Sequence, residues 1–123
     1  MRVADTSALF AFFEPRDEFH ARARAAFEGA DPIVVPAEVF TEVLFLARKR
    51  AGSASARNVG SFLWSQPNTE IQPSDTAVLM AAWGAFEASP KLSWTDCIVV
   101  ATCRELDAEP LSFDKDLLRA ARA

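Results

Sequence analysis

The strongest constraint on the fold is the alternation of short apolar runs with longer segments of helical periodicity. Apolar runs end at Ala4 and at Val35, and each is followed by a segment whose apolar residues recur every three or four positions. Parallel strands need long crossover connections, and helices supply them. The sequence therefore predicts an α/β sandwich with a mostly parallel sheet.

Pattern and punctuation give the order of the elements. The expected strands cover residues 2–4, 33–35, 70–71 and 111–113. The expected helices cover residues 7–13, 17–28, 37–50, 54–64, a segment that follows the capping residue Asp75, 93–106 and 115–122. No repeat or long linker interrupts this order, and 123 residues suffice for one buried core. We therefore expect residues 1–123 to form a single domain.

Cysteine and histidine content bears on the cellular compartment and on the class of metal site. Cys97 and Cys103 lie six residues apart in one predicted helix, about 9 Å along its axis, which is too far for a mutual disulfide. His20 is the only histidine and no CxxC pair occurs, so no zinc set is expected. The apolar runs are too short to span a membrane and no signal region begins the chain. We expect a cytoplasmic protein with reduced thiols.

The net charge limits the ways in which the chain could bind nucleic acid. A formal charge of −4 argues against a general nucleic-acid coat, because such binding depends on many contacts from Lys and Arg to phosphate. Bound cations would reverse the field around a cluster of carboxylates. Acidity and a phosphate ligand are therefore compatible when a metal ion is present.

Four acidic residues stand at comparable places in the pattern: Asp5, Glu42, Asp96 and Asp114. Each has a structural explanation by itself. Asp5 and Asp114 could cap the helices that follow them, Asp96 fits a capping box with Ser93, and Glu42 could face water. Taken together, two follow strands and two lie near the starts of helices that would pack over the same sheet edge. Their oxygens would suit Mg²⁺ or Mn²⁺.

Two other acids compete for a place in this group. Glu38 lies one helical turn before Glu42 on the same helix face, where the macrodipole alone could explain it. Asp116 follows Asp114 but falls within the last predicted helix, where we expect greater exposure.

Four segments of the chain resemble the signature stretches of PIN domains, in the same order and at similar spacings. They are VADTSAL at 3–9, PAEVFTEV at 36–43, LSWTDCIVVA at 92–101 and LSFDKD at 111–116. The length of the chain resembles that of the VapC-type toxin ribonucleases within this family. The resemblance implies an α/β/α sandwich with four or five short strands and about seven helices. Relatives usually add a final edge strand, but residues 117–123 of this chain have a helical composition.

The resemblance also implies a site and a reaction. Asp5, Glu42, Asp96 and Asp114 would form the catalytic quartet, with Asp5, Asp96 and Asp114 binding Mg²⁺ or Mn²⁺. Thr6 or Ser7 would orient Asp5 or contact phosphate, and Asp116 matches a further acid near the substrate. The implied reaction is hydrolysis of an RNA phosphodiester by metal-activated water.

The implied partners are a second copy of the chain and an antitoxin. The antitoxin's C-terminal segment would lie in an apolar groove near the active site. Five phenylalanines are more than the inner faces of two helices need, so we expect some of them to line an interaction surface. They are Phe10, Phe12, Phe13, Phe40 and Phe45.

Three other interpretations remain open. A phosphoaspartyl enzyme of the haloacid dehalogenase type also places Asp after its first strand, but it needs a second acid where this chain has Ser7. A non-catalytic interaction module would use the acids only as helix caps. A housekeeping RNA-processing nuclease would have the same PIN domain without the antitoxin.

Overall fold

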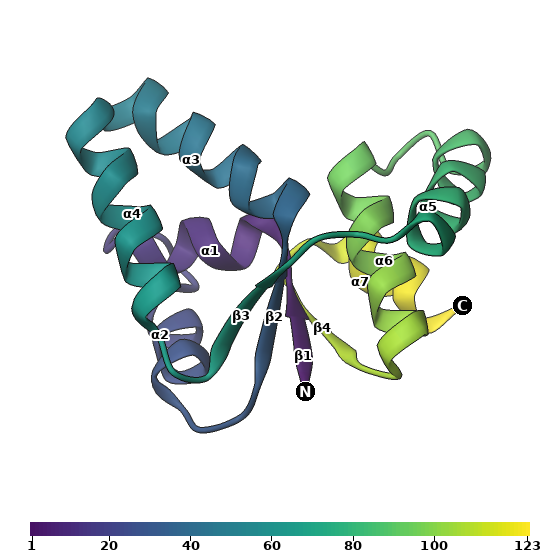
Figure 1. The fold of residues 1–123 in the computed structure, drawn as a ribbon, viewed down its shortest axis with the longest axis horizontal. Coiled ribbons are helices and arrows are strands. Elements are labelled where there is room, and N and C mark those ends of the chain that lie inside the picture. Colours follow the sequence, from purple (N-terminus) through teal and green to yellow (C-terminus); the bar gives the residue numbers. More distant parts are fainter.

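A parallel sheet of four short strands forms the centre of the computed structural model, which describes all 123 residues (Figure 1). The strands are β1 (Arg2–Ala4), β2 (Ile33–Pro36), β3 (Thr69–Gln72) and β4 (Glu109–Leu111), in the spatial order β3-β2-β1-β4. The seven helices are α1 (Thr6–Phe13), α2 (His20–Glu28), α3 (Ala37–Ala51), α4 (Ser53–Ser65), α5 (Thr76–Ala88), α6 (Trp94–Leu106) and α7 (Lys115–Arg122). The predicted α/β sandwich with a parallel sheet is confirmed.

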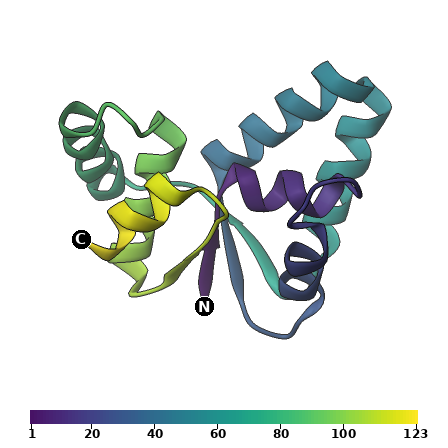
Figure 2. The same cartoon turned by 180° about the vertical axis from the view of Figure 1, so that it is seen from behind.

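The helices form one layer on each side of the sheet. Helices α1 to α4 lie on one side, and α5 to α7 lie on the other, as the two opposite views show (Figures 1 and 2). Val3 and Ala4 of the central strand β1 have no exposed surface. The largest apolar cluster joins the sheet to α1, α2, α3, α4, α6 and α7, and a smaller one joins α5 to α6. Both layers are therefore fixed to the sheet by buried contacts.

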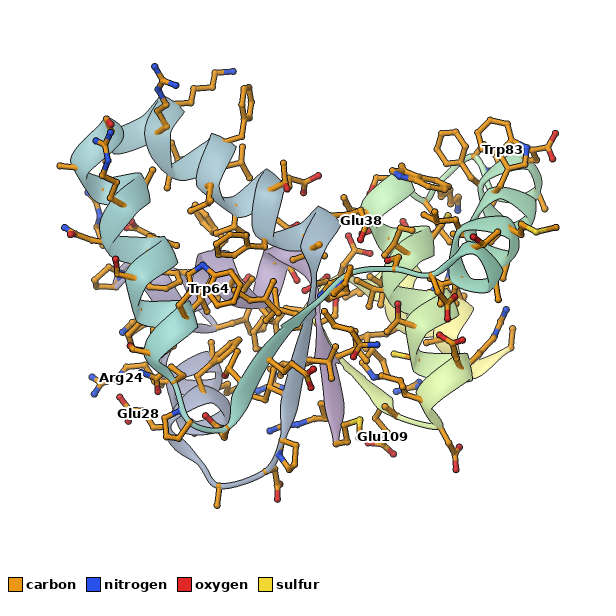
Figure 3. All side chains as sticks on the ribbon, viewed as in Figure 1. Arg24, Glu28, Glu38, Trp64, Trp83 and Glu109 are labelled. Carbon is orange, nitrogen blue, oxygen red and sulfur yellow. The ribbon has the colours of Figure 1, made fainter.

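The parallel topology brings the carboxyl ends of all four strands to one edge of the sheet. Asp5 is the first residue after β1, and α3 begins directly after Pro36, the last residue of β2. The fixed φ of a proline suits the residue that enters a helix, and Pro36 has φ −56°. Glu38 lies at this edge in Figure 3, whereas Glu109 lies at the opposite end of the sheet. The edge where strands end is where sheets of this type bind ligands.

Strand β4 lies two residues earlier than the predicted segment 111–113. Glu109 N–H donates to Met1 O and Leu111 O accepts from Asp5 N–H, so the ladder with β1 ends at Leu111. Pro110 lies between these two residues and faces the open edge, where a proline removes a donor without breaking the ladder. No fifth strand extends this edge, and a three-residue strand without its outward N–H is a poor template for one.

Helix α2 begins at His20, three residues later than predicted. The Asp17 carboxylate accepts a hydrogen bond from Phe19 N–H at 2.8 Å, and His20 N–H donates to Asp17 O. This local turn competes with helix formation at residues 17–19. His20 Nδ1 lies 2.8 Å from Ala11 O and links α2 to α1, which is a structural contact.

The structure bears on the state of the cysteines and on the possibility of a membrane-spanning helix. Both cysteines are free and buried, as expected, and burial raises the pKa of the Cys103 thiol to about 12. None of the helices combines the length and apolar character that a membrane crossing requires.

Candidate active site

Asp5 is the most buried acid of the predicted group, with 2% of its surface exposed. One carboxylate oxygen accepts from Ala8 N–H at 2.9 Å and from Ser7 Oγ at 2.8 Å, and the other accepts from Ser112 Oγ. Asp5 is therefore the N-cap of α1, as its structural explanation predicts. A carboxylate has about four acceptor sites, so these three donors leave it capacity for one more partner.

Two serine hydroxyls tie Asp5 to the loop that follows β4. Ser112 Oγ donates to Asp5 and accepts from Asp114 N–H at 3.0 Å, and Ser7 Oγ accepts from Phe113 N–H at 3.0 Å. The Phe113 ring stacks on Phe19, with centroids 4.6 Å apart, which further holds this loop. The position of Asp114 is thus coupled to that of Asp5.

Asp96 lies in the first turn of α6 and completes the predicted capping box. Its carboxylate accepts from Ser93 N–H at 3.0 Å, while Ser93 Oγ accepts from Asp96 N–H. The other carboxylate oxygen has no protein donor, because capping uses only one of the two.

Glu42 comes to this site from α3 through a contact with α6. Thr95 Oγ1 donates to one Glu42 carboxylate oxygen at 3.1 Å. Glu38, the competing acid one turn earlier, instead accepts from Ser74 Oγ at 2.8 Å. Of the two, Glu42 is the residue that lies beside Asp96.

Asp114 is the N-cap of α7, and one of its oxygens accepts from Leu117 N–H at 2.9 Å. Asp116 has no hydrogen bond to these acids, and it lies 3.9 Å from the Arg119 guanidinium on an exposed surface. Thr6 differs from Ser7 in having a covered hydroxyl oxygen with no hydrogen-bond partner. Of the residues predicted near the substrate, only Ser7 therefore bonds to an acid of the quartet.

Electrostatic repulsion links Asp96 to each of the other three acids and affects the pKa of Asp5 and of Asp96 itself. Burial raises the pKa of Asp5, and the negative charge of Asp96 adds to that rise, while hydrogen bonds from Ser112, Ala8 and Ser7 oppose it. Burial also raises the pKa of Asp96, and the charges of Asp114 and Glu42 contribute. Carboxylates from four elements therefore repel one another at this edge of the sheet.

The donor chemistry of the site suits a divalent cation, although no ready-made cage is formed. No group of three Asp, Glu, His or Cys side chains is positioned to hold one ion. Asp96, Asp114 and Glu42 nevertheless each have one carboxylate oxygen without a protein donor. Hard oxygen ligands of this kind suit Mg²⁺ or Mn²⁺, and a cation would relieve their repulsion. The donor chemistry of these residues therefore fits such an ion, although binding it would require their side chains to move together.

The PIN domain family profile matches residues 2–123. The chain belongs to the PIN-domain family. This confirms the resemblance found in the four signature segments, and the four-stranded parallel sheet is the framework of this PIN domain. Comparison of the sequence with curated proteins gives no match.

Two solved structures share the fold of this PIN domain. VapC20 of Mycobacterium tuberculosis, described as a sarcin-ricin loop cleaving toxin, superposes with a TM-score of 0.85 at 20% identity, over 98% of this chain and 95% of that one. FitAcB from Neisseria gonorrhoeae superposes with a TM-score of 0.74 at 16% identity, over 100% and 94% of the two chains. At these identities the likeness concerns the fold.

Sequence reasoning missed two hydroxyls of the site. Ser112 stands two residues before Asp114, and Thr95 lies inside the capping box of α6. A hydroxyl close to an acid at a strand end could have indicated each. The contacts themselves join residues 107 and 53 positions apart, so only the fold reveals them.

Proposed function

We propose that this chain, as a single PIN domain, is a metal-dependent endoribonuclease that hydrolyses RNA phosphodiester bonds in the cytoplasm. We further propose that it is the toxin of a toxin-antitoxin pair. The main support is the position of Asp96, whose carboxylate is within electrostatic reach of Asp5, Asp114 and Glu42. Family membership and the fold shared with VapC20 support the same class of activity.

Each acid has a proposed role that its hydrogen bonds permit. Asp5, Asp96 and Asp114 would hold Mg²⁺ or Mn²⁺, which supplies Lewis acidity and lowers the pKa of water when bound. Glu42, held by Thr95, would use its free oxygen to orient the attacking water. These roles make capping and catalysis compatible, because each cap occupies only part of a carboxylate.

The hydroxyls near Asp5 divide between positioning and substrate binding. Ser7 would position Asp5, to which it is already bonded. The Thr6 hydroxyl has no hydrogen-bond partner and would contact the phosphate after a local movement. Asp116, which is partly exposed, would act only through groups of the substrate beyond the scissile phosphate.

Cleavage assays with matched substitutions test this proposal. Asp5→Asn and Asp96→Asn should each reduce Mg²⁺- or Mn²⁺-dependent RNA cleavage at least about 100-fold, in the range found when one transition-state contact is removed. Both variants should keep the circular dichroism spectrum of the parent. Asp31→Asn, at an exposed acid away from the site, is the control and should leave cleavage unchanged. Full activity in both site variants would refute the assignment.

We propose that the antitoxin docks in an apolar pocket beside the site. The pocket has a volume of about 120 Å³ between α1, α3 and α4, with Thr6 and Phe10 on one wall, Ala47 on another and Arg50 at its margin. Apolar cavities of about 150 Å³ accept a benzene molecule, so one apolar side chain of a partner would fit. Ala47→Phe should fill the pocket and weaken antitoxin binding while RNA cleavage persists. Unchanged binding would exclude this pocket.

We propose that a homodimer forms through helix α5. The helix exposes Leu79, Met80, Trp83 and Phe86, and its only charged residue is Glu87. Trp83 lies at the outer end of this layer in Figure 3. Light scattering at micromolar concentration should give a dimer for the parent and a monomer for Met80→Glu. Trp64→Glu, at a site equally exposed on α4, should remain dimeric. A monomeric parent would contradict the proposal.

A further inference from the structure

We propose that the exposed face of helix α3 beyond Glu42 binds an unpaired stretch of the RNA strand, with Phe45 stacking on a base and Lys49 binding a phosphate. This inference rests on the proposed nuclease function and adds the part of the substrate that this chain would hold. Sequence and structure support it through helix geometry, exposure and charge.

Helix geometry places these residues on the same face as Glu42. Successive residues turn by about 100° around a helix of 3.6 residues per turn, so Phe45 and Lys49 lie within about 60° of Glu42. The buried residues Val39 and Val43 lie about 60° and 100° from Glu42 in the other direction around the helix, away from Phe45 and Lys49. The Glu42 side chain faces Thr95 at the site, so the same face continues from the acids towards the end of α3.

Phe45 is unusually exposed for a phenylalanine. Its exposed fraction is 65%, whereas Phe12, Phe13 and Phe40 pack against the main apolar cluster. It has no aromatic partner, although most other phenylalanines in the molecule have one. A flat apolar ring held at the surface by a rigid helix can stack on a base, because every base presents a π face.

Charge along this part of the chain is strongly asymmetric. Residues 43–69 contain no Asp or Glu but carry Arg48, Lys49, Arg50 and Arg57, which leaves nine cations and seventeen acids in the rest of the chain. None of these four cations takes part in the three ion pairs of the molecule. Arg50 lies over the Phe10 ring, with 4.6 Å between guanidinium and centroid, while Lys49 is exposed. Lys49 is therefore free to bind an anion.

The combination of an exposed ring and a free cation favours single-stranded RNA over other anionic partners. Seven residues separate Glu42 from Lys49, a rise of about 10 Å along the helix, and stacked nucleotides advance about 3.4 Å each along a strand. The face thus spans about three nucleotides beyond the scissile phosphate. In a duplex the bases are paired and stacked, so they could not stack on Phe45. An acidic peptide would bind the cation, but its carboxylates would make no stacking contact with the Phe45 ring.

Binding measurements on an inactive parent test the inference separately from catalysis. The parent is Asp96→Asn in Mg²⁺, and the probe is a fluorescein-labelled 12-nucleotide single-stranded RNA followed by anisotropy. In this background Phe45→Ala should weaken binding about 5- to 150-fold, the loss expected for one base stack, and Phe45→Trp should restore it. Lys49→Ala should reduce the slope of log affinity against log salt by about 0.7.

Two controls address nonspecific effects of lost exposed groups. Trp64→Ala removes an aromatic side chain that is 67% exposed on α4, and Arg16→Ala removes a cation that is 92% exposed and pairs with Glu14. Both should bind RNA as the parent does. A 12-base-pair RNA duplex should bind the parent more weakly than the single strand.

Three outcomes would overturn the inference: unchanged affinity in Phe45→Ala, an equal loss in Trp64→Ala, or preference for the duplex. Binding of a fluorescein-labelled poly-glutamate peptide, with no binding of RNA, would overturn it in favour of an acidic protein partner. Failure of the nuclease proposal would differ, since wild type would then bind RNA without cleaving it. Conversely, a wild-type enzyme that cleaves RNA while the α3 variants bind normally would refute this inference alone.

Discussion

Ser112→Ala is the substitution that most directly tests the coupling between Asp5 and the β4–α7 loop. Ser112 is 8% exposed and its hydroxyl serves two partners, donating to the Asp5 carboxylate and accepting from Asp114 N–H. Alanine removes both contacts and leaves a void smaller than a water molecule. The Asp5 carboxylate would keep the hydrogen bonds from Ser7 and Ala8.

The expected loss of stability follows from these contacts. A hydrogen bond to a charged group contributes about 1.5–3 kcal/mol, and a buried donor left without an acceptor costs about 1–3 kcal/mol. Because Asp114 N–H is only partly buried, we expect the free energy of unfolding to fall by about 2–4 kcal/mol. For a chain of this length that corresponds to a decrease in Tm of about 6–15 °C.

Catalysis should respond to the same substitution through the pKa of Asp5. The Ser112 hydrogen bond lowers this pKa against the effect of burial, so its loss should raise the pKa further. The acidic limb of the cleavage profile should then move to higher pH, because Asp5 must be ionised to bind a cation. Thermal unfolding and pH–rate profiles measure the two effects, and Ser65→Ala on exposed α4 is the control. A Tm within 2 °C of the parent together with an unmoved acidic limb would refute the coupling.

Three other perturbations have defined outcomes. Mg²⁺ at 100 times its Kd should stabilise the protein by about 2.7 kcal/mol in thermal unfolding, and Asp96→Asn should abolish this gain. Equal stabilisation of the parent and of Asp96→Asn by Mg²⁺ would argue against the site. Burial raises the pKa of Asp5 in the folded state. The free energy of unfolding of the metal-free protein should therefore decrease as pH rises from about 4 through the folded pKa. Asp5→Asn should flatten this decrease, and an unchanged dependence of stability on pH in that variant would contradict the prediction. Gly52 has φ +91° between α3 and α4, so Gly52→Ala should cost about 1–3 kcal/mol in urea unfolding, and a neutral effect would contradict the strain.

Much of the fold could be predicted because local patterns and tertiary structure agree. Apolar periodicity and capping residues predicted all seven helices and the four strands, because these local patterns depend on residues only a few positions apart. The errors arose where a local signal opposed the structure. The position of β4 was predicted wrongly because Pro110 lies within it and proline is rare in strands. An edge strand nevertheless tolerates a proline whose nitrogen faces outward.

The positions of the four acids in the fold could be predicted from the sequence, but the hydrogen bonds that connect them could not. Asp5, Asp96 and Asp114 could be placed because they follow strands or begin helices. Asp5 and Asp114 are the N-caps of α1 and α7, and Asp96 completes the capping box of α6. The hydroxyl contacts of Ser112 and Thr95 depend on the packing of distant segments, for which no local pattern exists. The choice between Glu38 and Glu42 likewise needed the position of α6.

Anomalous diffraction from crystals soaked in Mn²⁺ tests the central claim most directly. We expect a manganese peak between the carboxylates of Asp5 and Asp96, with Asp114 as a further ligand and Glu42 close by. Crystals of Asp96→Asn should lose this peak. A peak at another place on the surface, or no peak at millimolar Mn²⁺ in crystals of the active protein, would contradict the claim that these acids form one cation site.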